Sequence, residues 1–357
     1  MEKFNYPIFK TKIEGKMQAF ALEDPAERKK YFEYKAGEEI EKIREFLRHG
    51  SFVASLLGPK NSGKGTYSKL FAEAVGADRI FHLSVGDVVR NVHEKVKSEE
   101  EKQNLKAFLN EHYRGPISVD DAMKALFERD TKTLLPDEFI LALLKREMKN
   151  SGNKAIFVDG FPRNLDQVSY SIYFRSLMDY QDNPDFFVFI DVPENIISER
   201  IKARVICPKC NVPRSLKLLK TKEVGYDEAK KEFYLICDNP GCDGARMVPK
   251  EGDEFGIEPI RARIEMDKKV MRMLMDMHGI SKIYLRNAVP VSVAKDYIDD
   301  YEITPMYRYE RDEKSGKIST FTVPWTVNDD EKELCYSLLP AGVVTGLIKQ
   351  ISSTLGL

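Results

Sequence analysis

Short apolar segments alternate with longer amphipathic stretches through the middle of the chain. The apolar segments are Phe52–Leu57, Ile80–Leu83, Ala155–Val158, Phe186–Val192 and Lys282–Leu285. Stretches with helical spacing, such as Glu138–Lys149, lie between them. This alternation predicts an α/β fold in which a parallel sheet is covered by helices on both faces. Residues 186–192 are apolar except at Asp191, a pattern typical of a strand that is buried on both sides.

The first part of the chain follows a different pattern. Asp24 and Pro25 form a helix start, with Asp24 as the N-cap and Pro25 at the first helical position. Apolar residues then recur mostly at spacings of three and four as far as about Arg48, which predicts a helix with one face against the body. We assign residues 1–50 to an N-terminal helical extension.

The last part of the chain also departs from the alternation. Met306–Arg311 and Lys317–Val323 flank a Ser315-Gly316 turn, a pattern that predicts a hairpin. A final helix is expected at about Ala341–Ser353. Residues 301–357 are therefore predicted to form a C-terminal extension with a hairpin and a helix, and the core is expected at 51–300.

A glycine-rich loop follows the first core strand and precedes a helical pattern. Its sequence, Gly58-Pro59-Lys60-Asn61-Ser62-Gly63-Lys64-Gly65-Thr66, has the spacing G-x-x-x-x-G-K. Glycines let backbone N–H groups wrap a phosphate chain, and the lysine supplies an ammonium for the transferring phosphates. A chance lysine in a glycine-rich turn is the alternative, but the strand–loop–helix context argues against it. The predicted nucleotide-binding residues are Gly58, Asn61, Ser62, Gly63, Lys64, Gly65 and Thr66.

Further motifs resemble those of the adenylate kinase family, of which the Gly65-Thr66 ending is also typical. Ser84-Val85-Gly86-Asp87-Val88-Val89-Arg90 resembles S-T-G-D-x-x-R, and Leu134-Leu135-Pro136-Asp137-Glu138 resembles L-V-P-D-E. Asp159-Gly160-Phe161-Pro162-Arg163, followed by Gln167, matches D-G-F-P-R-x-x-x-Q. The resemblance covers about residues 52–300. It implies a P-loop NTPase fold with three α/β/α layers, a five-stranded parallel sheet, a monophosphate-binding region at about 84–136 and a zinc-ribbon-like lid at about 205–252.

The resemblance also implies roles for individual residues. Arg90 and Arg163 bind the acceptor phosphate, and Asp159 orients magnesium through water. Arg200 and Arg204 match two arginines before the lid, of which one stacks on the ATP adenine and the other contacts phosphates. The predicted catalytic residues are Lys64, Arg90, Asp159, Arg163, Arg204 and Arg263. The predicted acceptor-binding residues are Ser84, Val85, Arg90, Leu135, Gly160, Arg163, Gln167, Arg261 and Arg263.

Several positions depart from the family pattern. Val85 replaces a threonine, Lys60 and Asn61 replace a Pro-Gly pair, and Val205 replaces a second arginine before the lid. The stretch between Asp87 and Leu134 is longer than usual for the acceptor-binding region. These departures bear on which acceptor is used and on how active the enzyme is.

Four of the five cysteines lie in the predicted lid, at Cys207, Cys210, Cys237 and Cys242. Two close-spaced pairs of thiolates can hold zinc in a tetrahedral all-sulfur site, and a pair of disulfides or free core thiols are the alternatives. Many bacterial adenylate kinases carry a four-cysteine zinc at this place. Such a site would be structural and would stabilise a lid too small to hold its own core.

The composition adds little that is specific. The 357 residues carry a formal net charge of −1 at pH 7, so no global charge points to nucleic acid or to a membrane surface. No apolar stretch has the length of a membrane span or the form of a signal peptide. We expect a cytoplasmic monomer.

The predicted reaction is reversible phosphoryl transfer from Mg²⁺–ATP to a nucleoside monophosphate, with AMP favoured. A kinase for UMP, CMP or GMP is one alternative, although the long lid argues against UMP/CMP kinases. A nucleotide-binding sensor or scaffold, with the terminal segments as partner-binding modules, is another, and the altered loop and lid favour it.

Overall fold

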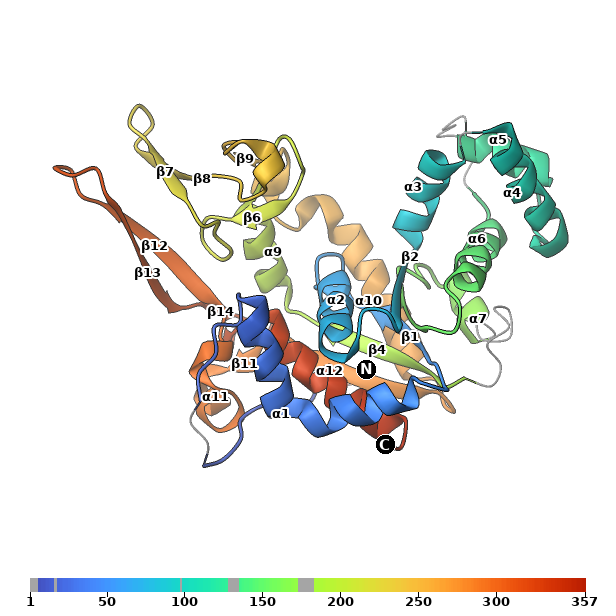
Figure 1. Ribbon diagram of the computed structural model, residues 1–357, viewed down its shortest axis with the longest axis horizontal. Coiled ribbons are helices and arrows are strands. Elements are labelled where there is room, and N and C mark those ends of the chain that lie inside the picture. Colours follow the sequence, from blue (N-terminus) through green and yellow to red (C-terminus); the bar gives the residue numbers. More distant parts are fainter. Residues whose placement is uncertain (1–5, 16–17, 97, 128–134, 173–182) are drawn as a thin grey trace.

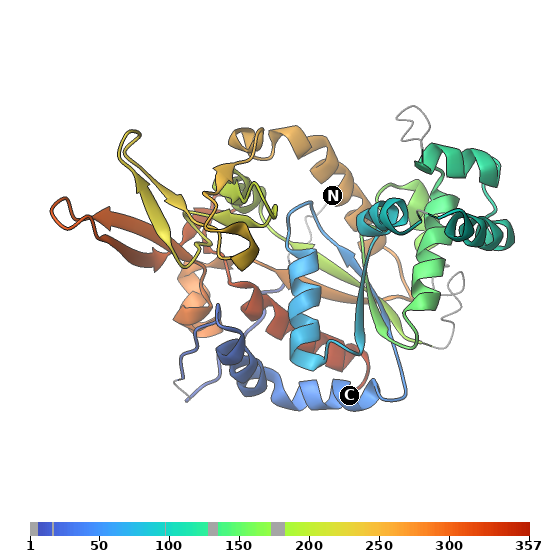
Figure 2. The same cartoon turned by 45° about the horizontal axis from the view of Figure 1, so that its top comes forward.

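The computed structural model describes residues 6–15, 18–96, 98–127, 135–172 and 183–357, without the side chains of residues 93–95 and 171–172. A five-stranded parallel sheet forms the centre, in the order β10-β4-β1-β3-β2 (Figures 1 and 2). The strands are β1 Val53–Leu57, β2 Ile80–Ser84, β3 Ala155–Asp159, β4 Asp185–Asp191 and β10 Ser281–Arg286. They match the five predicted apolar segments to within two residues at each end.

Helices cover both faces of the sheet, because successive strand residues point to opposite sides. Ala54, Phe157 and Val188 face one hydrophobic cluster, which also holds side chains of helices α1, α2 and α12. Ile156 and Phe187 face the opposite side, where α6 and α10 pack. These helices are α1 Pro25–Phe46, α2 Lys64–Val75, α6 Asp137–Asn150, α10 Arg261–Met275 and α12 Pro340–Thr354. The predicted three-layer α/β/α fold is confirmed.

The two ends of the chain lie side by side on one face of this sheet (Figure 1). Helix α1 begins as predicted, since the Asp24 carboxylate accepts hydrogen bonds from the backbone N–H groups of Ala26 and Glu27 at 2.9 and 3.0 Å. Helix α12 lies against it, and Thr345 Oγ1 bonds Tyr31 OH at 3.2 Å. Both terminal helices therefore share one hydrophobic core with the sheet.

The segment after β2 forms a group of helices beside the sheet. They are α3 Val85–Lys95, α4 Glu99–His112, α5 Val119–Phe127 and α6, with α7 Asp166–Ile172 following β3. Ser98 and Glu101 form a capping box that starts α4. The long stretch noted in the sequence thus contains the helices α4 and α5. Leu134 lies outside the described residues.

The cysteine-rich segment follows helix α9, Glu194–Lys202, and consists of two small sheets. One sheet contains β5 Arg204–Ile206, β6 Pro213–Ser215 and β9 Val248–Pro249. The other is a hairpin of β7 Val224–Asp227 and β8 Glu232–Leu235. This segment is called the lid below.

Beyond β10, the chain forms β11 Val289–Pro290 and α11 Val291–Tyr297, and then the predicted hairpin of β12 Pro305–Arg311 and β13 Ile318–Pro324. Strands β14 Thr326–Asn328 and β15 Leu334–Tyr336 join β11 in a third small sheet before α12 begins.

The β12–β13 hairpin lies along the β7–β8 hairpin of the lid (Figures 1 and 2). Tyr309 OH donates to the Leu216 carbonyl at 2.7 Å, and the Tyr307 N–H donates to the Lys217 carbonyl at 2.8 Å. The rings of Tyr309 and Phe233 lie 5.5 Å apart between centroids. The C-terminal segment is therefore bound to the lid as well as to the sheet.

Among the described residues, no helix has both the length and the apolar character of a membrane span.

Candidate active site

The phosphate loop connects β1 to α2 at the carboxyl end of the sheet. Gly63 has φ +100°, a left-handed conformation that favours glycine, and it is the N-cap of α2. A Cβ on Gly58 would lie 2.8 Å from Ser62 Oγ and 2.9 Å from the Ile190 carbonyl oxygen, so this position also needs glycine. No side chain among the described residues caps the first backbone N–H groups of α2. The loop can therefore offer these groups to an anion.

Lys64 lies folded back into this loop. Its Nζ donates to the carbonyl oxygens of Gly58 and Pro59 at 2.8 and 3.0 Å and lies 3.9 Å from an Asp159 oxygen. Burial lowers the pKa of the Lys64 amine, an effect that Asp159 partly opposes. A buried cation next to neutral carbonyls gains more from a bound phosphate than an exposed one does, because solvent screens it less.

A cavity of about 560 Å³ opens in front of the loop. Lys64, Arg90, Asp159, Arg163 and Arg263 line it, together with Gly58, Asn61 and Gly160. These residues come from α2, α3, the end of β3 and α10, which are far apart in the sequence. The fold therefore brings together all of the predicted catalytic residues except Arg204.

Arg163 is the most constrained cation of this cavity. Its Nε is buried, and within the described part of the chain it has no hydrogen-bond partner. Burial and the nearby Arg263 lower the pKa of the Arg163 guanidinium. A buried unsatisfied donor and neighbouring like charges are both costly, and both costs fall when an anion binds between them.

The start of α3 supplies the neighbouring wall. Ser84 is the N-cap, and its Oγ accepts a hydrogen bond from the Asp87 N–H at 3.4 Å. Arg90 reaches the cavity and pairs with Asp87. Val85 is 5% exposed and packs in the hydrophobic cluster behind α3, outside the cavity.

Two residues predicted to contact the acceptor base lie elsewhere. Gln167 is buried, and its Oε1 accepts from the Arg163 N–H at 2.7 Å while its Nε2 donates to Asp137 at 2.5 Å. Leu135 is half-buried against the helices after β2. Contact with a base by either residue stays a prediction, and for Gln167 it requires an exchange of hydrogen bonds.

Three of the predicted arginines also lie outside the cavity. Arg200 donates to Ser337 Oγ at 2.9 Å. Arg204 makes two hydrogen bonds of 2.6 Å to the Asp253 carboxylate at the base of the lid. Arg261 pairs with Glu258 and Glu194. With these partners, neither Arg204 nor Arg261 lines the cavity that holds Lys64.

Sequence analysis missed a carboxylate in the cavity. Asp267 lines the wall opposite the loop and accepts a hydrogen bond from Arg263 Nε at 2.9 Å. It follows Arg263 by four residues on α10, so helical spacing alone could have paired the two. Lys60 of the phosphate loop also lines the cavity.

The four lid cysteines come together. The Sγ atoms of Cys207, Cys210, Cys237 and Cys242 all lie within 4.8 Å of one another, and those of Cys210 and Cys237 are 3.7 Å apart. Four sulfurs placed tetrahedrally around zinc, at about 2.3 Å each, lie about 3.8 Å apart. The pKa of the Cys207 thiol is lowered to about 6. The largest cause is the hydrogen bond from the Cys210 backbone N–H, which burial partly opposes. The cluster therefore fits zinc.

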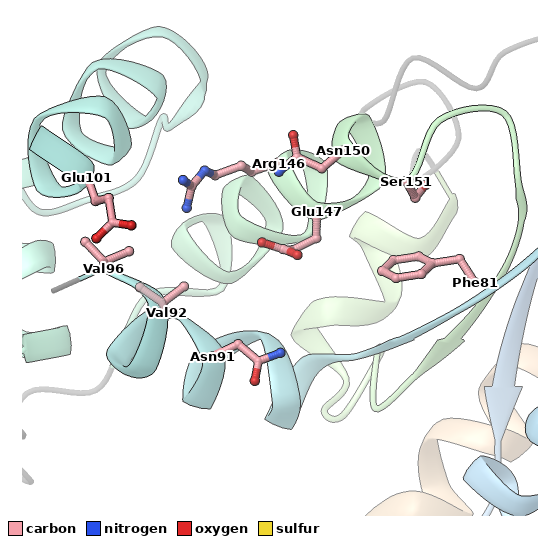
Figure 3. A pocket seen from close by; sticks show the side chains of 9 residues that line it. All are labelled: Phe81, Asn91, Val92, Val96, Glu101, Arg146, Glu147, Asn150 and Ser151. Carbon is pink, nitrogen blue, oxygen red and sulfur yellow. The ribbon is translucent and has the colours of Figure 1, made fainter. Parts of the chain in front are cut away.

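A second cavity, of about 400 Å³, lies on the other side of α3 (Figure 3). Arg146 and Glu147 of α6, Asn91 of α3 and Glu101 of α4 point toward it. None of the predicted site residues lines it. The candidate active site is therefore the cavity at the phosphate loop.

Comparisons with known proteins agree with this geometry. A family model described as an AAA domain matches residues 57–205, which include the loop and the first arginines. The adenylate kinase of Thermotoga neapolitana is 28% identical over 231 residues, which cover 64% of this chain and 86% of that protein. The adenylate kinase of Clostridium novyi is 32% identical over 227 residues, or 63% of this chain and 85% of that protein.

The chain belongs to the adenylate kinase family. Membership in the adenylate kinase family makes it a P-loop phosphotransferase of the nucleoside monophosphate kinase type. The segment matched by the family model includes Gly58, Lys64, Arg90, Asp159 and Arg163 of the cavity, whereas Arg263 and Asp267 lie beyond it.

Proposed function

We propose that the protein is an adenylate kinase that catalyses the reversible reaction of ATP and AMP to two ADP. The observation that carries this proposal is the cavity in which Lys64, Arg90, Arg163 and Arg263 meet Asp159. A cluster of four cations at a phosphate loop suits two phosphate chains that face each other. The relatives that carry the name adenylate kinase favour AMP as the acceptor.

The protein's part in this reaction is alignment and charge stabilisation. Lys64 and the loop N–H groups hold the donor phosphates, and Arg90 and Arg163 orient the acceptor phosphate. Arg263 spreads the charge of the moving phosphoryl group. Arg204 and Arg261 join them when the lid closes, which also excludes water.

Magnesium enters with ATP. Its hard charge prefers oxygen ligands, and the partly exposed Asp159 carboxylate at the end of β3 can bind its waters. The ion, when bound, neutralises the negative charge of the donor phosphates. Zinc, held by the four lid cysteines, is proposed as a structural ion without a part in the chemistry.

The proposed organisation follows the sequence assignment. Residues 84–136 form the acceptor-binding region, 205–252 form the lid, and the segments 1–50 and 301–357 are additions to the kinase core. The position of Arg90 on α3 supports the first assignment, and the clustered cysteines support the second.

A coupled assay of ADP formation from ATP tests the proposal, with AMP, UMP, CMP and GMP compared as acceptors at equal concentration. We expect AMP to give the largest kcat/KM. Faster turnover with another monophosphate would move the protein to a different specificity. Tight ATP binding without ADP formation from any acceptor would instead favour the sensor function.

A further inference from the structure

A buried hydrogen-bond network joins the C-terminal segment to the phosphate loop. Ser337 and Leu338 lie between β15 and α12, beyond the part of the chain that resembles the family. Ser337 is fully buried, and its Oγ donates to Asn287 Oδ1 at 3.1 Å. The Leu338 N–H donates to the same oxygen at 2.8 Å. Asn287 is 1% exposed and follows β10, the edge strand of the sheet.

The network continues to the first turn of α2. Asn287 Nδ2 donates to Tyr67 OH at 2.8 Å. The Tyr67 ring packs over the phosphate loop so closely that a Cβ on Gly63 would lie 2.9 Å from it. A side chain that is hydrogen-bonded to this network therefore has a fixed position relative to the phosphate loop.

Arg200 is tied to the network at two points. Its Nη2 donates to Ser337 Oγ at 2.9 Å, and its guanidinium also hydrogen-bonds Tyr67. Because Ser337 donates its single proton to Asn287, its oxygen is left to accept from Arg200. Taken as a whole, the Arg200 residue is half-buried and is not sealed in the core. A guanidinium held by its edge in this way offers a face on which an aromatic base can stack.

We propose that Ser337 is a positioning residue for the base of the donor nucleotide, acting through Arg200. The inference rests on the proposed function, which places ATP on the phosphate loop. A segment outside the shared kinase core thus completes the donor site. The hydroxyl fixes the guanidinium before ATP arrives, so less side-chain freedom is lost on binding.

The test is the direct binding of Mg²⁺–ATP, measured by calorimetry without an acceptor. Ser337→Ala removes the acceptor oxygen and should weaken the binding of Mg²⁺–ATP by about two- to twelve-fold, the worth of one hydrogen bond. Ser337→Thr keeps the hydroxyl and should restore most of the affinity. The matched control is Ser352→Ala, a buried serine of α12 outside this network, which should bind like the wild type.

Two further measurements separate positioning from a general structural role. The KM for AMP of Ser337→Ala should match that of Ser352→Ala, although the loss of buried hydrogen bonds should lower the melting temperature of Ser337→Ala. In an Arg200→Ala background, Ser337→Ala should cause no further loss of ATP affinity, because the two residues act as one unit. If Ser337→Ala does not fold, Ser337→Cys, with a weaker acceptor of similar size, takes its place in the same cycle.

The outcomes are distinguishable. Equal ATP affinity of the wild type and Ser337→Ala, or an equal loss with and without Arg200, overturns the positioning role and leaves the proposed kinase intact. Failure of the wild type to bind Mg²⁺–ATP overturns the proposed function and this role together.

Discussion

Lys64→Met should abolish most of the activity without harming the fold. The substitution keeps an unbranched apolar stem of similar length and removes the ammonium that lies against the carbonyls of Gly58 and Pro59. Removal of one preorganised donor from a charge-stabilising site typically costs about 10²- to 10³-fold in kcat. The burial of Lys64 and its place in the cavity with three arginines put it in that class.

The same substitution makes a prediction about stability. The pKa of Lys64 is lowered by burial in the folded chain, so the unfolded chain holds this proton more tightly. The charged amine therefore costs stability at neutral pH, and this cost disappears as the pH rises through the folded pKa toward the unfolded value of about 10.4. Lys64→Met should melt no lower than the wild type at pH 7, and its advantage should shrink as the pH rises.

The assay couples ADP formation to a spectroscopic signal, with Mg²⁺–ATP and AMP at saturation, and calorimetry gives the melting temperatures. Lys69→Met is the control, because Lys69 is exposed on the same helix and lies outside the cavity. A Lys64→Met enzyme with turnover within a few-fold of the wild type would refute the assignment of the loop. A large loss of stability at pH 7 would refute the account of its burial.

Three other changes test single contacts. Protein purified without chelator should contain about one zinc per chain by elemental analysis. The Cys207→Ser variant should lose this zinc. The Cys335→Ser variant should keep it, because Cys335 is a buried cysteine outside the lid. A metal-free wild type that is indifferent to chelators would exclude the zinc site. Val85→Thr should change AMP affinity by less than about two-fold, because Val85 packs behind α3 and a hydroxyl there gains no ligand; tightening of about ten-fold would show that the residue reaches the acceptor. Asp267→Asn keeps an oxygen for Arg263 and removes a negative charge from the cavity, so ATP should bind up to about five-fold more tightly in calorimetry; weaker binding would mean that the carboxylate itself is needed.

The sheet and the phosphate loop were predictable because their signals are local. A run such as Phe186–Val192 is apolar at every position except Asp191, which is typical of a strand covered on both sides. The spacing from Gly58 to Lys64 encodes a loop conformation directly, and Gly63 adopts the positive φ that the motif needs. Asp24 and Pro25 likewise determine a helix start through contacts within one turn.

What could not be predicted depends on contacts between distant residues. The hydrogen bond from Gln167 Nε2 to Asp137 joins residues 30 positions apart and arises only when two separate segments meet. The order of the arginines along the chain does not indicate that Arg204 pairs with Asp253, outside the cavity. Ser337 and Arg200 are 137 residues apart in the sequence, and only the fold brings their side chains into contact.

The contact between the C-terminal hairpin and the lid has a mechanical consequence. The hairpin is fixed to the body at its base, where Trp325 is 2% exposed and its N–H donates to the Thr304 carbonyl at 3.0 Å. Further out, Tyr309 bonds the lid, and the Arg311 guanidinium lies 4.9 Å from the Tyr226 ring centroid. In the proposed closure, rotation of the lid toward Lys64 would bend the hairpin or break these contacts. Either cost would be subtracted from the binding energy that closes the lid, so residues of the C-terminal hairpin would take part in setting the balance between open and closed forms.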